Sequence, residues 1–205
     1  MTNRAIYHIT HADNLANIIR EGRLWCDAQR VARNLANTNI GYRHLKGRRL
    51  HHPVTVAAGG MLGNYVPFNF CPRSVMLYVV EKGHESYQEG QKPIIHLVSS
   101  VQTILTTGRP WCFTDRHADL RYANQFDSLG KLGEIDWTVM PLRQWGGDQD
   151  VKEKRQAEFL VHDWCPWSAI EVIGVVNRDI AARVEAAISG AGHRPRVQVH
   201  GDWYY

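Results

Sequence analysis

Glu158 occupies the setting in the chain that most favours chemistry. It follows a polar stretch, residues 154–156, and precedes the apolar residues 159–161. A carboxylate at the entrance of such a strand can accept a hydrogen bond from a ribose hydroxyl and stabilise the positive charge that develops on a sugar ring during glycosyl transfer. The pattern alone favours the alternative, a solvent-exposed glutamate on an alternating strand, because charged side chains are mostly exposed.

The segment from Tyr7 to Thr10 is a second candidate, because it joins a predicted strand, residues 5–9, to a predicted helix that ends at Gly22. An imidazole from His8 and a hydroxyl from Thr10 could together contact a ribose or an amide group. The alternatives are a structural histidine and a threonine that only caps the helix.

Residues 43–52 form a basic segment, with four lysine or arginine residues and three histidines in ten positions. Pro53 and a glycine pair follow, so we predict a helix that gives way to an exposed loop. The planar guanidinium groups of Arg48 and Arg49 could bind the phosphates of a dinucleotide or of a nucleic acid. The alternative is a solvated cationic face.

Several common motifs are absent from the sequence. There is no glycine-rich dinucleotide fingerprint, no P-loop, no His-Glu-x-x-His pair and no Gly-x-Ser-x-Gly. A dehydrogenase interpretation therefore has no support. The four cysteines are widely spaced, which argues against a zinc site, and we predict free, mostly buried thiols and no metal.

Length and composition predict one domain, residues 1–205, because 44% of the residues are hydrophobic and can build a core. The formal net charge of +4 is a mild bias toward anionic partners. No apolar run has the length of a membrane span, and the N-terminus lacks a signal-peptide pattern. We expect a cytoplasmic protein with no membrane partner.

Hydrophobic patterning predicts an α+β fold without regular strand–helix alternation. Pro67 suggests that its strand is an edge strand or starts late. Strands are predicted at residues 5–9, 65–70, 75–80, 93–98, 156–162, 169–176 and 197–205, and helices before Gly22 and at 99–107, 114–126 and 179–188.

Six segments, in order and spread over nearly the whole chain, together resemble the DarT family. They are Tyr7–His11 with Asn14-Leu15, Tyr65–Phe68 with Phe70–Ser74, Ile95–Ser100, Phe113–His117, Lys154–Val161 and Asp202–Tyr205. The resemblance implies a compact ADP-ribosyltransferase fold, related to poly(ADP-ribose) polymerases, with a mostly antiparallel split sheet and flanking helices. It implies a toxin, a glycosyltransferase of the pentosyl-transferring class, that moves ADP-ribose from NAD onto ring N3 of thymidine in single-stranded DNA. It also implies the antitoxin DarG, a macrodomain protein, as partner.

The resemblance places the family's functional residues at matching positions of this chain. Residues 30–51 correspond to the element that covers NAD, and residues 117–158 correspond to the loop that reads the substrate. The catalytic residues correspond to Glu158 and Arg49; the NAD contacts to His8, Ile9, Thr10, Asn17, Trp25 and Arg49; and His117 to a position near the target base. We predict further DNA contacts at Arg48, Lys154 and Arg155.

The family's arginine is credited with handling the proton on N3. A guanidinium stays protonated in proteins, so we expect Arg49 to orient the base and stabilise its anionic character, with His117 or water as the final proton acceptor. Two alternatives remain: an ADP-ribosyltransferase that acts on protein or RNA, and a non-catalytic nucleic-acid-binding module that uses residues 43–52.

Overall fold

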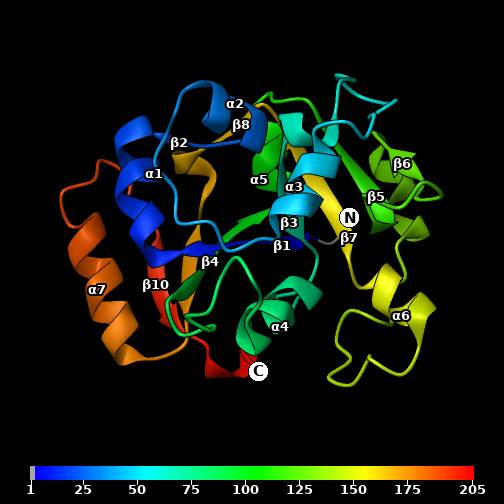
Figure 1. The fold of residues 1–205 in the computed structure, drawn as a ribbon. Coiled ribbons are helices and arrows are strands. Elements are labelled where there is room, and N and C mark those ends of the chain that lie inside the picture. The colour runs from blue at the N-terminus through cyan, green and yellow to red at the C-terminus, as the bar shows by residue number, and fades with distance from the viewer. Residues whose placement is uncertain (1–2) are drawn as a thin grey trace.

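A mixed sheet forms the centre of the protein, seen here in a computed structural model that describes residues 3–205. Within these residues eight strands pair in the order β10-β9-β4-β1-β3-β7-β5-β6 (Figure 1). The strands are β1 (Ala5–His11), β3 (Tyr65–Asn69), β4 (Ile94–Ser100), β5 (Trp111–His117), β6 (Gln125–Phe126), β7 (Ala157–His162), β9 (Val172–Val175) and β10 (Arg196–Val199).

The sheet is split between β1 and β3. β1 pairs with β4 along its whole length, from Ala5 to His11, whereas among the described residues it meets β3 only where Tyr7 faces Asn69. β3 pairs fully with β7, and this pairing sets Asn69 opposite Glu158. Every pairing in the described sheet is antiparallel except that of β9 with β10. The predicted α+β class, with a mostly antiparallel split sheet, is confirmed.

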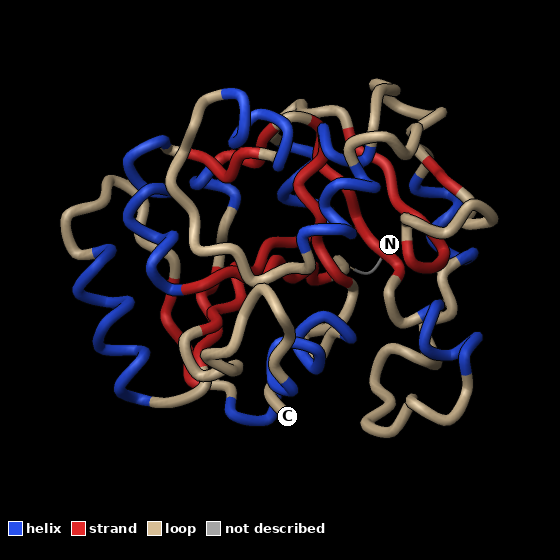
Figure 2. The backbone as a smooth tube through the Cα atoms, viewed as in Figure 1, coloured by secondary structure: helices blue, strands red, loops and turns tan. Residues whose placement is uncertain are grey.

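Helices and a small second sheet surround this framework (Figure 1). α1 and α7 lie at one side of the molecule and α6 at the other, while α3 lies over the split of the sheet. A long loop, residues 33–42, crosses in front of the sheet between α2 and α3 (Figure 2). The helices are α1 (Leu15–Glu21), α2 (Asp27–Ala32), α3 (Arg43–Arg49), α4 (Val75–Lys82), α5 (Val101–Thr106), α6 (Gln149–Lys154) and α7 (Arg178–Ile188), and the second sheet pairs β2 (Arg23–Trp25) with β8 (Trp164–Pro166).

Aromatic side chains on neighbouring strands fill the core beside the future site. The rings of Trp111 and Phe159 stack at a centroid distance of 5.4 Å, and those of Phe113 and Phe126 stack at 5.2 Å. Full burial of one such side chain contributes roughly 1.5–3 kcal/mol. This packing fixes β5, β6 and β7 relative to one another. None of the helices within residues 3–205 has both the length and the apolar character that a membrane crossing requires.

Two predicted elements were wrong. Residues 75–80, predicted as a strand from their valines, form α4, because Ser74 caps a helix by accepting a hydrogen bond from the backbone N–H of Leu77 at 3.1 Å. Residues 114–126, predicted as a helix, continue β5 to His117 and then turn into β6.

Smaller differences concern the ends of elements. The predicted strand at 197–205 ends at Val199 and is followed by a 3-10 turn, Gly201–Trp203. The residue that caps the first helical turn is His11, whose Nδ1 accepts from the N–H of Asp13, and Thr10 remains in β1. Gly22 ends α1 with a left-handed backbone (φ 65°), as its position in the sequence predicted.

Candidate active site

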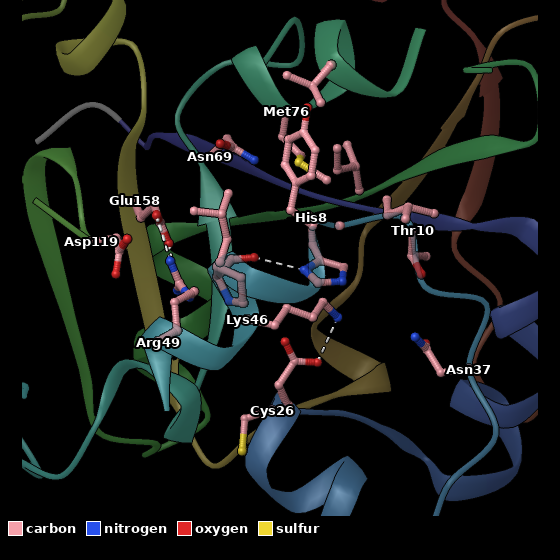
Figure 3. A pocket seen from close by; sticks show the side chains of 18 of the residues that line it. His8, Thr10, Cys26, Asn37, Lys46, Arg49, Asn69, Met76, Asp119 and Glu158 are labelled. Atoms are coloured by element: carbon pink, nitrogen blue, oxygen red, sulfur yellow. Dashed lines mark hydrogen bonds and ion pairs between the residues drawn. The ribbon is translucent and has the colours of Figure 1, made fainter. Parts of the chain in front are cut away.

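A cleft of about 280 Å³ opens where β1 and β3 separate. α3, α4 and the loop 33–42 complete its walls. Figure 3 shows Glu158, Asp119 and Arg49 at one end of the cleft and Thr10 and Asn37 at the other. The predicted site residues that line it are His8, Ile9, Thr10, Trp25, Arg49, His117 and Glu158.

Arg49 and Glu158 form a two-pronged ion pair in the cleft wall. Nη1 of Arg49 donates to Oε1 of Glu158 at 3.0 Å, and Nη2 donates to Oε2 at 2.9 Å (Figure 3). Glu158 is buried, and the Arg49 side chain is 15% exposed. Such parallel, charge-assisted hydrogen bonds are short and directional, so they hold the carboxylate in one orientation.

The ion pair keeps Glu158 ionised in spite of its burial. Burial alone would raise the pKa of this carboxyl, but the charge and hydrogen bonds of Arg49 outweigh burial and hold the pKa below its ordinary value. For Arg49 the same balance applies: burial favours the neutral form, and Glu158 reverses this so that the pKa is raised. The site therefore presents a fixed negative charge with a fixed cation beside it.

His8 is held at the split by the backbone of β3. Its Nδ1 lies 2.8 Å from the carbonyl oxygen of Pro67. Because a carbonyl only accepts, Nδ1 carries the proton, and in the neutral ring Nε2 is left as an acceptor. Burial lowers the pKa of His8 even though the Pro67 contact opposes this, so the ring is neutral at pH 7. His8 thus offers a hydrogen-bond acceptor to whatever occupies the cleft.

Asn14 is a site residue that sequence reasoning did not single out. Its amide Nδ2 donates to Oγ1 of Thr10 and to the carbonyl oxygen of Thr38, both at 3.0 Å, and its Oδ1 accepts from the N–H of Thr38 at 2.7 Å. These bonds attach the loop 33–42 to β1 at the end of the cleft remote from Glu158. The signal was its position four residues after Thr10, inside the segment that carries the resemblance.

Asp27 and Lys46 also line the cleft and were missed. Nζ of Lys46 donates to Oδ1 of Asp27 at 3.0 Å, which links α3 to the first turn of α2. Burial raises the pKa of Asp27, but the Lys46 charge and hydrogen bond bring it below its ordinary value. Lys46 belongs to the basic segment, yet nothing in the sequence separated it from its neighbours.

His117 and Asp119 lie beside Glu158 at the end of β5. Burial lowers the pKa of His117, although the Glu158 charge opposes this, so the ring is neutral at pH 7. The Asp119 side chain is only 4% exposed and accepts from Nη2 of Arg48 at 2.5 Å. Asp119 had no distinguishing sequence signal.

Four predicted contacts lie outside the cleft lining. Asn17 is turned to the loop, where its Nδ2 donates to the carbonyl oxygen of Ala36 at 2.9 Å. Arg48 is 62% exposed and paired with Asp119. Lys154 forms an ion pair with Asp150 at 2.5 Å on α6.

The prediction that Arg155 contacts DNA was wrong. This side chain is 0% exposed, and its guanidinium donates to the carbonyl oxygens of Val139 and Met140 at 2.6 and 2.7 Å and of Arg73 at 2.7 Å. Arg155 ties the loop before α6 to the segment before α4, so its charge is unavailable to any ligand.

The thiols and the polar groups of the cleft decide what the site can hold. The cysteines are free and buried, as predicted, and no three potential metal-ligating side chains gather within residues 3–205. A dinucleotide needs cations for its phosphates, polar groups for its ribose hydroxyls and flat surfaces for its rings. Arg30 and Lys46 supply cations, Thr10 and Asn69 supply polar groups, and Trp25 and Tyr42 supply rings. The cleft residues fit an NAD molecule.

Comparison with known proteins agrees with this geometry. A family model described as DarT, ssDNA thymidine ADP-ribosyltransferase, matches residues 7–205. A DNA ADP-ribosyl transferase of Thermus sp. (strain 2.9) is 43% identical over 202 residues, which cover 98% of this chain and 95% of that protein.

Two solved structures of the Thermus sp. 2.9 DarT are also similar. The complex with ADP-ribosylated ssDNA has a TM-score of 0.93 at 42% identity and covers 98% of this chain and 96% of its own. The complex with NAD+ has a TM-score of 0.88 at 40% identity, with coverages of 98% and 97%. The chain belongs to the DarT family of ssDNA thymidine ADP-ribosyltransferases.

Proposed function

We propose that this protein transfers ADP-ribose from NAD to ring N3 of thymidine in single-stranded DNA, with Glu158 and Arg49 at the reaction centre. The observation that carries the proposal is the two-pronged Arg49–Glu158 pair in the wall of a cleft that also contains His8 and Thr10. Family membership supports the substrates, and the Thermus relative provides complexes with NAD+ and with ADP-ribosylated ssDNA.

In this proposal the donor lies along the cleft with its nicotinamide ribose at Glu158. The carboxylate accepts a hydrogen bond from a ribose hydroxyl through a lone pair that Arg49 leaves free. Nε2 of His8 and the Thr10 hydroxyl contact the sugar or the amide, while Arg30 and Lys46 neutralise the phosphates. Lys46 does so by giving up part of its contact with Asp27.

Glu158 acts through its charge when the glycosidic bond breaks. The bond between the ribose carbon and nicotinamide cleaves, nicotinamide departs with the bonding electrons, and positive charge grows on the ribose. A carboxylate already ionised and oriented stabilises this charge without having to reorganise. Thymine N3 then forms the new bond to the same carbon and loses its proton.

Arg49 and His117 serve the incoming base. The Arg49 guanidinium remains protonated, so its role is to orient the base and to stabilise negative charge at N3. His117 is neutral at pH 7, lies in the same cleft and is the proposed acceptor of the N3 proton. A single strand presents its bases unpaired, which avoids an unpairing cost of a few kcal/mol.

The experiment uses purified protein, NAD and three short oligonucleotides that are identical except at one position. This position carries thymidine, N3-methylthymidine or deoxycytidine. Mass spectrometry should find one added ADP-ribose, with release of nicotinamide, only for thymidine. An unmodified thymidine strand would contradict the activity, and modification of the N3-methyl strand would contradict N3 as the site.

The same experiment separates the alternatives. Modified protein or RNA in competition with the oligonucleotide would favour a different acceptor. DNA binding without nicotinamide release would favour a non-catalytic module.

We also propose the macrodomain antitoxin DarG as partner and the cytoplasm as the place of action. Membership of the family supports the first, and the four free thiols fit a reducing compartment. Co-expression of DarG should remove ADP-ribose from DNA and restore growth. Persistent growth arrest with DarG present would argue against the pairing.

A further inference from the structure

α3 carries Arg49 into the site, yet apolar packing does little to hold this helix in place. Across residues 43–49, all of which the structure describes, no side chain is buried. Helices this short are unstable on their own. Gly47 in the last turn adds backbone freedom, and a Cβ added there would meet nothing within 4 Å. The position of α3 must therefore depend on its polar contacts.

Three cations of α3 each meet a carboxylate on a different element. Lys46 pairs with Asp27 of α2 at 3.0 Å, Arg48 with Asp119 at 2.5 Å, and Arg49 with Glu158 of β7 at 2.9 Å. Asp119 differs from an ordinary surface partner, because its side chain is 4% exposed while that of Arg48 is 62% exposed. A buried carboxylate that loses its cation is strongly disfavoured, so Asp119 holds Arg48 firmly.

The two neighbouring arginines fix the rotation of α3 about its axis. Successive side chains point about 100° apart around a helix, because one turn takes 3.6 residues. Arg48 and Arg49 therefore reach two separate acids, and Figure 3 shows Asp119 and Glu158 side by side at the same end of the cleft, with Arg49 beside them. A rotation that broke the Arg48–Asp119 contact would move the Arg49 guanidinium off Glu158.

We propose that Asp119 is a positioning residue for the transfer reaction: by holding Arg48 it fixes the rotation of α3 and sets the Arg49 guanidinium on Glu158. The inference rests on the proposed roles of Arg49 and Glu158. It also reassigns Arg48, which was predicted to contact DNA, to a contact within the protein.

The test is a double-mutant cycle of Asp119→Asn and Arg48→Gln. Asp119→Asn keeps the shape of the side chain, and Arg48→Gln changes a mostly exposed residue and is expected to fold. Arg183→Gln is the control, because it removes an ion pair of a half-exposed arginine with Asp13 on the far side of the molecule (Figure 1). Each variant is measured for kcat, for KM of NAD, and for hydrogen exchange of the backbone amides of α3.

Each single variant should lower kcat by roughly ten- to a hundred-fold, the effect of a small misplacement of a catalytic group. KM for NAD should change little, and the α3 amides should exchange faster. The double variant should fall no further than the worse single variant, because both act through one contact. The Arg183 control should match the parent.

Three results would overturn the inference: parent-like kcat in Arg48→Gln, additive losses in the double variant, or lowered kcat with unchanged exchange of α3. If Asp119→Asn does not fold, Arg48→Gln with its exchange measurement decides alone. The exchange readout does not depend on the chemical role of Glu158, so failure here is distinguishable from failure of the proposed function.

Discussion

The guanidinium of Arg49 meets the carboxylate of Glu158 through two parallel hydrogen bonds of 3.0 and 2.9 Å, although 109 positions separate the two residues in the chain. One partner comes from a short helix that lies over the split sheet, and the other from an interior strand of that sheet. The contact therefore joins a weakly anchored element to a firmly packed one.

Glu158→Gln should remove the chemistry and spare the binding of the donor. Glutamine keeps the shape of the side chain but supplies no charge to stabilise the ribose. We expect the transfer rate to fall by roughly 10²–10³-fold, while the Kd for NAD, measured by calorimetry, stays within a few-fold of the parent. Near-normal turnover in single-turnover assays would clear Glu158 of the catalytic role.

Arg49→Lys should retain the positive charge and lose the fork. A lysine ammonium cannot make two parallel hydrogen bonds to one carboxylate, so the transfer rate should drop by roughly ten-fold or more. The weaker contact also lets the pKa of Glu158 rise, because Arg49 is what holds it below its ordinary value. The acid limb of the pH–rate profile should therefore move to higher pH. Arg183→Lys on α7 is the matched control, and an unmoved acid limb in Arg49→Lys would contradict the explanation.

His117 should give the reaction a dependence on pH below neutrality. Burial lowers the pKa of His117, so the ring stays neutral below the ordinary histidine value of about 6.5. If it accepts the N3 proton, kcat/KM for DNA should be constant near pH 7 and should fall as the pH decreases through the lowered pKa. His117→Gln should lose activity and flatten this limb; an unchanged limb in the variant would assign it to another group.

His96 should make the fold itself sensitive to acid. It is fully buried, with Nε2 3.0 Å from the carbonyl oxygen of Pro72, and burial lowers its pKa to about 4. Between about pH 6.5 and pH 4 the unfolded chain binds a proton at this ring that the folded protein does not. Stability is therefore complete above pH 6.5 and is lost toward pH 4, by roughly 3 kcal/mol. Urea unfolding of His96→Gln should show a shallower pH dependence; an equal slope would exclude His96 as the cause.

Arg155→Gln should damage the fold rather than the chemistry. The change leaves buried carbonyl oxygens of Arg73, Val139 and Met140 without their donor. We expect a loss of roughly 3 kcal/mol or more, or about 6–12 °C in Tm. At a temperature where the variant is folded, kcat should be close to that of the parent. Normal Tm with weakened DNA binding would restore Arg155 as a ligand contact.

Local patterns predicted the fold class and most elements, and they failed where tertiary contacts decide. The valines at 75, 79 and 80 favour a strand in isolation, but the Ser74 cap and burial of Leu77 select a helix. Thr114 has the form of a helix cap, yet its Oγ1 instead accepts from the N–H of Glu158 at 3.2 Å and donates to the carbonyl oxygen of Arg116. That contact depends on a strand more than forty residues away in the chain.

The site shows the same division. The position of Glu158 at a strand entrance and that of His8 near a strand end were visible in the sequence, and the resemblance added Arg49 and His117. The acid partners of the α3 cations were not visible. Asp27 and Asp119 are unremarkable in sequence, and only the folded chain brings them beside Lys46 and Arg48. The opposite error, Arg155, arose because nothing local distinguishes a buried arginine from an exposed one.

The hydrogen bond from His8 to Pro67 has one more consequence. Its acceptor is an oxygen of the main chain, so replacing the proline ring by another side chain leaves that oxygen where it is. The tautomer of His8 is thus dictated by the alignment of two strands and not by the identity of any neighbour. The ¹⁵N chemical shifts of this imidazole should report whether those strands keep their spacing as the cleft fills.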